Sequence, residues 1–120
     1  RYFPHRTYLE KGILAVGNSD WFVTSANIAQ QIYGVVTRKG YTSEVIGPEQ
    51  AISVKDALRL YTINGAYASF EENHKGSLEP GKLADMVVLD RDIFTIPADE
   101  IKEVKVETTI VGGEIVYQRS

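Results

Sequence analysis

The fold of this chain is decided by residues 75–90, whose sequence is KGSLEPGKLADMVVLD. The first half is a turn, because Pro80 fixes a φ of about −65° and Gly81 tolerates a positive φ, as a type II turn requires. The second half is the apolar run Met86 to Leu89, which lies between two aspartates. Such a run is typical of a strand buried on both faces. Spacing alone would also fit a hairpin or strand entry in any small β-module.

The residues after this segment are rich in strand signals. The sequence VKVETTIV, residues 104–111, begins with the alternation of a half-buried strand. The pair Gly112-Gly113 then predicts a hairpin, and residues 114–117 supply the return strand. The last third of the chain is therefore expected to be β-rich.

The first two thirds of the chain have an α/β pattern. The stretch 1–11 has Pro4 at a first helical position, and Gly12 is its stop signal. The apolar run at 13–16 then predicts a buried strand, and the small polar residues 17–20 predict a loop. Helix, strand and polar loop in succession are typical of a parallel α/β structure. A second helix is predicted at 27–39, with an inner face formed by Ile28, Ile32, Val35 and Val36. A third is predicted at 54–61, with Ser53 as its N-cap. A further helical turn is predicted at 66–70, after a break at Asn64-Gly65.

Composition excludes several classes of protein. The 120 residues are one domain's worth, with the 43% apolar and 24% charged residues of an ordinary soluble protein. A formal charge of −3 gives no basis for binding nucleic acid or an anionic membrane, and no apolar run is long enough to cross a bilayer. No cysteine is present for a disulfide or a thiolate metal site. No signal peptide opens the chain, which favours a cytoplasmic location.

The histidine content is low for an enzyme. The chain has two histidines, His5 and His74, and it begins at Arg1 rather than at methionine. Because a metallohydrolase or a histidine-based enzyme would need more, we expect a C-terminal piece of a larger protein. Both histidines are predicted to be solvent-exposed and not to be ligands.

Asp20 is the principal candidate for chemistry. It follows a predicted strand, and ligand sites in parallel α/β folds lie beyond the carboxyl ends of strands. A carboxylate at such a place can bind a metal and take a proton from metal-bound water. The alternative is that Asp20 caps the following helix or turn.

Three other residues are weaker candidates. Arg6 has the charge to bind an anionic substrate group, with an exposed helical arginine as the alternative. Trp21 would form a wall of the pocket beside Asp20, with a buried aromatic as the alternative. Arg38 lies at a predicted helix end, where we expect it to complement the helix dipole or to pack against the rest of the chain.

Residues 75–90 closely resemble the segment that returns the chain from the barrel to the small β-sandwich in metal-dependent hydrolases of the amidohydrolase superfamily. Residues 12–23, GILAVGNSDWFV, resemble the last barrel strand in the branch similar to YtcJ and the N-substituted formamide deformylases. The sequence departs from that branch at Asn18, where glycine is expected, and at Phe22, where proline is expected. The same branch is resembled at residues 3–7, 37–38, 57–62 and 109–113.

The resemblance implies an α/β fold in two parts. Residues 1–75 would form the last βα unit or units of a (β/α)8 TIM-type barrel. Residues 76–120 would form strands of the small C-terminal β-sandwich, the composite domain. We therefore expect the remainder of the parent barrel to be the main partner, and homo-oligomerisation is left open.

The resemblance also implies a metal site. Asp20 matches the aspartate after the eighth barrel strand, which ligates the metal and shuttles a proton. The full-length protein would hold Zn²⁺ or another divalent metal, with a His-X-His pair, a carboxylated lysine or acidic residue and further histidines upstream. None of these upstream ligands is present, so we expect the isolated chain to bind no metal and to be inactive.

Two hypotheses for the function follow. In the first, the chain is a fragment of a metal-dependent amidohydrolase that hydrolyses a C–N bond of the amide type, other than a peptide bond, in a small-molecule substrate. In the second, it is a non-catalytic structural or protein-binding module derived from the amidohydrolase tail. Retention of Ser19-Asp20 argues against the second, because a structural relic needs no carboxylate there.

Overall fold

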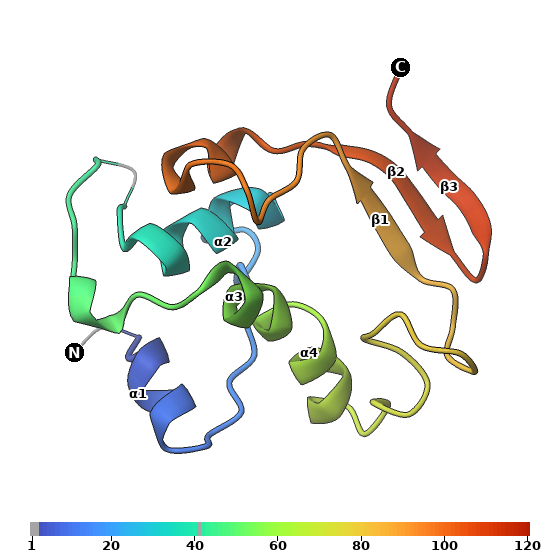
Figure 1. Cartoon of the computed structure of the whole chain (residues 1–120), viewed down its shortest axis with the longest axis horizontal. Coiled ribbons are helices and arrows are strands. Elements are labelled where there is room, and N and C mark those ends of the chain that lie inside the picture. The colour runs from blue at the N-terminus through green and yellow to red at the C-terminus, as the bar shows by residue number, and fades with distance from the viewer. Residues whose placement is uncertain (1–2, 41) are drawn as a thin grey trace.

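The computed structural model describes residues 3–40 and 42–120 and places a group of short helices beside a small antiparallel sheet (Figure 1). Of these residues, no helix is long and apolar enough to span a membrane. The elements in chain order are α1 (His5–Glu10), α2 (Ile28–Thr37), the 3-10 helix η1 (Pro48–Gln50), α3 (Val54–Leu60), α4 (Ile63–Ala68), β1 (Met86–Leu89), the 3-10 helix η2 (Ala98–Glu103), β2 (Val106–Val111) and β3 (Glu114–Gln118).

The hydrophobic core lies where α2, α3 and η2 meet. Its most deeply buried large side chains are Leu60 and Ile101, which are 2% and 0% exposed. Full burial of such a side chain contributes about 1.5–3 kcal/mol. The other buried members of this cluster are Ile32, Ile52, Ala57, Ile93 and Val104.

The first two helices form close to where they are predicted. Gly12 ends the first helical segment with a φ of +67°, and residues 1 and 2 of that prediction lie outside the described residues. The side chain of Asn27 caps α2 by accepting a hydrogen bond from the Ala29 N–H, and left-handed Arg38 ends the helix. The predicted inner face is wrong at Ile28, which is 46% exposed, because the core contacts α2 further along the helix.

The N-cap of α3 is confirmed, whereas the predicted start of the next helix is wrong. Ser53 Oγ accepts a hydrogen bond from the Asp56 N–H at 3.1 Å. The α4 helix begins at Ile63 and runs through the predicted break at Asn64-Gly65. The Asn64 side chain bonds to a distant carbonyl, so it does not compete with the hydrogen bonds of its own helix.

The turns of the last third are confirmed. The Lys82 N–H donates to the Glu79 carbonyl at 3.2 Å, and Gly81 between them has a φ of +92°. Gly112 and Gly113 have φ values of +59° and +86° and join β2 to β3. Positive φ at both central residues is the geometry of a type I′ hairpin.

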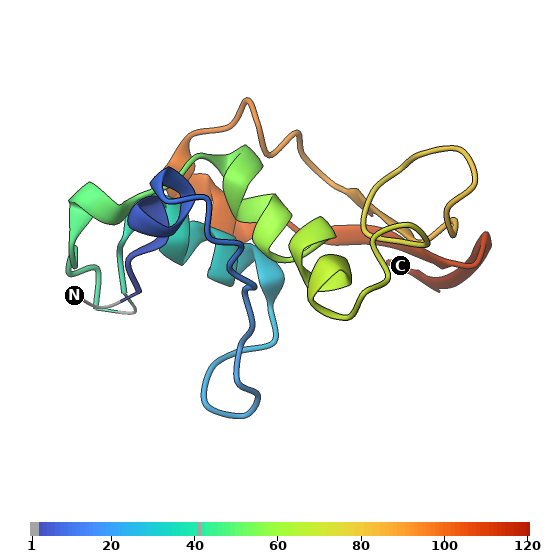
Figure 2. The ribbon, with the colours of Figure 1, turned by 90° about the horizontal axis from the view of Figure 1, so that it is seen from below.

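The sheet has three antiparallel strands in the order β1-β2-β3. The prediction that β1 is buried on both faces is wrong, since Val87 and Val88 are 54% and 49% exposed. Both faces are open because the strands project beyond the helices (Figures 1 and 2). On β3, every residue from Glu114 to Gln118 is exposed.

Residues 13–16 do not form the predicted strand. The segment is extended, but the structure assigns no strand there, and Ile13 and Leu14 are about half exposed. A strand requires a neighbouring strand for its backbone hydrogen bonds, and no parallel partner lies among the described residues. The apolar character of the run is therefore not matched by burial in this chain.

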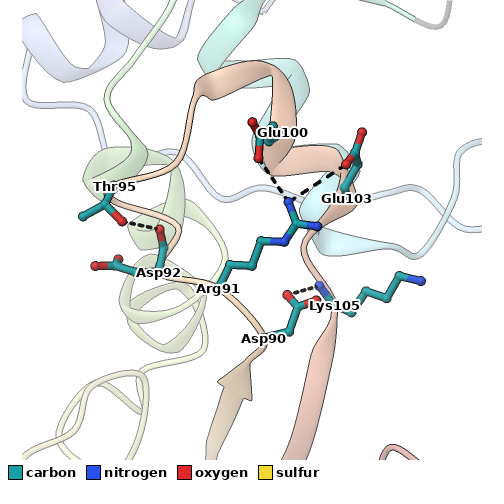
Figure 3. A network of polar contacts seen from close by, with 7 residues as sticks. All are labelled: Asp90, Arg91, Asp92, Thr95, Glu100, Glu103 and Lys105. Atoms are coloured by element: carbon teal, nitrogen blue, oxygen red, sulfur yellow. Dashed lines mark hydrogen bonds and ion pairs between the residues drawn. The ribbon is translucent and has the colours of Figure 1, made fainter.

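A polar network stabilises the connection between β1 and β2, which contains η2 (Figure 3). The Asp90 carboxylate accepts from the Lys105 N–H at 2.9 Å, and the Asp90 N–H donates to the Lys105 carbonyl at 3.0 Å. Arg91 donates to Glu100 at 3.1 Å. The two bonds between Asp90 and Lys105, one to a carboxylate and one between backbone groups, hold the chain where β1 and β2 begin to pair.

Candidate functional site

Asp20 lies on a loop that projects from the helices between residues 17 and 27 (Figure 2). Asp20 has a φ of +47°, and its carbonyl accepts a hydrogen bond from the Val23 N–H at 2.7 Å. Its exposed carboxylate makes no hydrogen bond or ion pair with any described residue. The Asp20 carboxylate therefore does not cap the helix that follows, because the side chain of Asn27 caps it.

Asn18 supports the turn differently from a glycine. The left-handed residue of this turn is Asp20 and not Asn18. Asn18 contributes its side chain, since Asn18 Oδ1 accepts a hydrogen bond from the Asp20 N–H at 2.8 Å. This is an Asx turn, in which a side chain replaces a backbone acceptor.

The segment that leads to Asp20 is fastened to α3 and α4. The Gly17 N–H donates to the Leu60 carbonyl at 3.0 Å. Asn64 Nδ2, from α4, donates to the Ala15 carbonyl at 2.8 Å. Neither contact was predicted from the sequence, although an asparagine inside a helix is a signal that its side chain has a partner elsewhere.

Gly17 also lies against an aromatic ring. A Cβ atom added there would be only 2.4 Å from Cζ of Tyr61, a contact that requires the ring or the segment to move. Burial raises the pKa of the Tyr61 phenol, so the ring is neutral at pH 7. Glycine at this position therefore allows the segment to pass closely over the end of α3.

We expect Gly17→Ala to destabilise the chain by about 1–3 kcal/mol, the usual cost of overpacking. Gly34→Ala is the matched control, because a Cβ at this helical glycine meets no atom within 4 Å. That substitution should stabilise α2 by about 0.5–1 kcal/mol. Urea unfolding of both variants compares the free energies, and a Gly17→Ala variant as stable as the original chain would contradict the close contact with Tyr61.

A cavity of about 940 Å³ opens beside the Asp20 loop. Its wall includes Asp20, Tyr33, Arg38 and Tyr61, and thus joins the loop to α2 and to the end of α3. Arg38 is 9% exposed, and its Nε donates to the Ile46 carbonyl at 3.0 Å. Arg38 therefore packs at the end of α2, in agreement with one of its two predicted roles.

The structure does not bring Trp21 and Arg6, two of the three weaker candidates, to this cavity. Trp21 is 72% exposed and is not among the lining residues. Arg6 donates from Nε and Nη2 to the Ala51 carbonyl, at 3.0 and 2.8 Å, which links α1 to the segment after η1. Substrate roles for Trp21 and Arg6 stay predictions.

His5 differs from its expected exposure, whereas His74 is exposed as predicted. His5 is partly buried beneath the ring of Phe3, and its Nδ1 makes no hydrogen bond with the described residues. Desolvation, and then the positive charge of Arg38, lower the pKa of His5 below 6.5. His5 is therefore a neutral lining residue of the cavity at pH 7.

The lowered pKa of His5 predicts a pH-dependent stability. Below pH 6.5 the unfolded chain takes up a proton at this residue more readily than the folded chain, so the free energy of unfolding should fall as the pH decreases through the folded-state pKa. Above pH 6.5 the contribution of His5 should be constant. Urea unfolding between pH 7.5 and pH 5 should show a smaller decrease for His5→Gln; equal decreases would contradict this origin.

The described residues do not form a metal site by themselves. Catalytic zinc sites use three protein ligands and an open position. No group of three histidine, cysteine, aspartate or glutamate side chains with suitable geometry is found among residues 3–40 and 42–120. Any metal site that included the exposed Asp20 would need its other ligands from outside the described residues.

Comparisons with known proteins show what this chain is similar to. A model of the amidohydrolase family matches residues 1–117. The N-substituted formamide deformylase of Arthrobacter pascens is 34% identical over the whole chain, which covers 22% of that protein. The amidohydrolase YtcJ of Bacillus subtilis is 31% identical over 98% of the chain and 23% of its own length.

Other relatives match the same region. A 5-methylthioadenosine/S-adenosylhomocysteine deaminase of Symbiobacterium thermophilum is 34% identical over 90% of the chain and 27% of its own length. The crystal structure of an amidohydrolase from Thermotoga maritima matches 95% of the chain and 25% of that protein, with a TM-score of 0.68 and 24% identity, and so supports the fold. The chain thus spans about a quarter or less of the first relatives it matches. The resemblance to the deformylase and YtcJ branch is confirmed, and the chain belongs to the amidohydrolase family.

Proposed function

We propose that this chain is part of a longer metal-dependent hydrolase that cleaves a C–N bond of the amide type in a small molecule. The observation that carries the proposal is that Asp20 is exposed, lines a cavity, and has a carboxylate with no hydrogen-bond or ion-pair partner among the described residues. Family membership supports the reaction class, since relatives of this chain are named as a deformylase and a deaminase.

In this proposal, Asp20 handles the proton of the reaction. Water adds to the carbon of the C–N bond, and the Asp20 carboxylate accepts the proton that the water loses. The same proton passes to the leaving nitrogen as the C–N bond breaks. General acid–base catalysis of this kind contributes about 10²–10⁴-fold to a rate. A divalent metal, when bound, supplies a water whose pKa is lowered to about 7.

The remaining parts of the site belong to the rest of the parent protein. The segment 13–17 has the place of a last barrel strand, and its exposed side chains Ile13 and Leu14 support packing against further strands. The division into a barrel part, residues 1–75, and a β-sandwich part, residues 76–120, stays a prediction. We expect the isolated chain to be inactive because it supplies a single candidate ligand. The cytoplasmic location and any homo-oligomer also stay predictions.

The test uses the full-length protein. Hydrolysis of N-substituted formamides and simple amides is measured before chelation, after dialysis against a chelator, and after the addition of Zn²⁺. We expect turnover of at least one amide, its loss on chelation and its recovery with metal. A well-folded full-length protein that turns over no substrate and binds no divalent metal would overturn the proposal.

The second candidate is a non-catalytic module that binds another protein. It is favoured by the exposed apolar side chains of the sheet, which include Val87, Val88, Ile115 and Val116. The same metal and turnover measurements separate the two candidates. An inactive, metal-free protein that forms a stable complex through this sheet would support the module.

A further inference from the structure

Asn64 is a buried polar residue inside a helix. The residue is 4% exposed, and it is the second residue of α4. Asparagine is a weak helix former, and a buried amide is costly unless it is hydrogen-bonded. Here Asn64 Nδ2 donates to the Ala15 carbonyl at 2.8 Å, which compensates the burial. The side chain therefore joins two parts of the chain that are 49 positions apart.

Three hydrogen bonds follow one another along the segment that carries Asp20. The first is the bond from Asn64 to the Ala15 carbonyl, and the second joins the Gly17 N–H to the Leu60 carbonyl at 3.0 Å. The third joins the Asp20 N–H to Asn18 Oδ1 at 2.8 Å. Among the described residues, the first two are the hydrogen bonds that join residues 14–18 to the rest of the chain.

These bonds have different origins. The bond at Gly17 is between backbone groups, so no side chain donates or accepts it. The bond at Ala15 depends on the side chain of Asn64, so a substitution of Asn64 can remove it. A Cβ added at Gly65 of the same helix would lie 4.0 Å from Val16 Cγ1, so the segment passes near the helix at this point.

We propose that Asn64 is a positioning residue, which holds the 13–17 segment against α4 and thereby fixes the placement of the Asp20 carboxylate. The inference rests on the proposed function, in which Asp20 carries the proton. A displacement of about 1 Å at a catalytic group can lower a rate about 10²-fold. Loss of the Asn64 bond should therefore reduce the chemical step while substrate binding is largely retained.

The test compares Asn64→Asp with Asp20→Asn and with the double variant in the full-length protein. Aspartate has nearly the size of asparagine, but its carboxylate is an acceptor and cannot donate to the Ala15 carbonyl. We expect Asn64→Asp to lower kcat by about 10–100-fold with KM changed by less than about twofold. In the Asp20→Asn background, the same substitution should change the residual kcat by less than about twofold, because the group it positions is gone.

Gln50→Glu is the matched control. Gln50 is also a buried amide, 5% exposed, and its Oε1 accepts hydrogen bonds from Thr7 on α1, away from the 13–17 segment. This variant introduces the same chemical change and should leave kcat within about twofold of the original value. Asn64→Ala is measured in parallel, since it removes the donor without adding a buried charge, and it should show the same lack of additivity with Asp20→Asn.

The outcomes distinguish a failure of the positioning role of Asn64 from a failure of the proposed role of Asp20. If Asp20→Asn lowers kcat and neither Asn64 variant does so, the positioning role is wrong and the proposed function stands. If the Asn64 variants lower kcat equally in both backgrounds, Asn64 is merely structural and the inference is overturned. If Asp20→Asn leaves kcat unchanged, the role of Asp20 fails, and the positioning role fails with it.

Discussion

Asp20→Asn in the full-length protein is expected to lower kcat by about 10²–10⁴-fold, the range that a general acid–base group contributes. Asparagine has nearly the same shape but cannot accept the proton in the proposed reaction. The thermal stability should be unchanged, because the carboxylate is exposed and makes no hydrogen bond or ion pair with the described residues. Amide hydrolysis and a thermal unfolding curve, measured on the same preparation, separate the loss of chemistry from a loss of folding.

The control for this prediction is Glu114→Gln, which also neutralises an exposed carboxylate. Glu114 begins β3 and has no ion pair among the described residues. Its replacement should leave kcat and the unfolding temperature unchanged. An Asp20→Asn protein that hydrolyses amides as rapidly as the Glu114→Gln protein would show that Asp20 carries no proton in the reaction.

Gly76→Ala is expected to produce the largest loss of stability, about 2–5 kcal/mol. Gly76 has a φ of +93°, which costs an alanine about 1–2 kcal/mol. The new Cβ would also lie 2.8 Å from Ala66 Cβ and 2.9 Å from Ile63 Cα. Because Ile63 Cα belongs to the backbone of α4, the contact can be relieved only by moving a helix or the chain, at a further cost of about 1–3 kcal/mol.

Gly81→Ala isolates the steric part of this effect. Gly81 has nearly the same φ, +92°, but no atom lies within 4 Å of its added Cβ. It should therefore show the backbone cost alone, about 1–2 kcal/mol. Urea unfolding of the two variants gives the difference directly. Equal losses of stability would mean that the helix α4 does not press against Gly76.

Features that depend on neighbouring residues were predictable from the sequence. The turn at Gly81, the hairpin at Gly112-Gly113 and the cap at Ser53 each follow from the conformational preferences of the residues that form them. None of them needs a partner from a distant part of the chain. For that reason the sequence pattern and the structure agree there.

Features that depend on distant partners were not predictable in the same way. The runs Met86–Leu89 and 13–16 are apolar enough for burial, but burial requires a second layer or adjacent strands, which the described residues do not supply. The helix α4 contains Asn64-Gly65 because the amide of Asn64 has a partner 49 positions away. No local pattern specifies that partner.

The candidate site was predictable only in part. The position of Asp20 after an apolar run identified it as a candidate, and the structure shows an exposed carboxylate beside a cavity. His5 was expected to be exposed, yet it is partly buried, and one of the groups near it, the guanidinium of Arg38, comes from a distant part of the chain. The support from Asn64 and Leu60 depends on the same kind of contact.

The three-stranded sheet has a consequence for the fate of this polypeptide in a cell. Its outer strands β1 and β3 each pair on one side only, and apolar side chains such as Val88 and Val116 are exposed beside those unpaired edges. An unpaired edge of this kind is a template on which other extended chains add, as in amyloid. We therefore expect the polypeptide, when it is free of a covering layer, to aggregate or to be bound by chaperones and degraded.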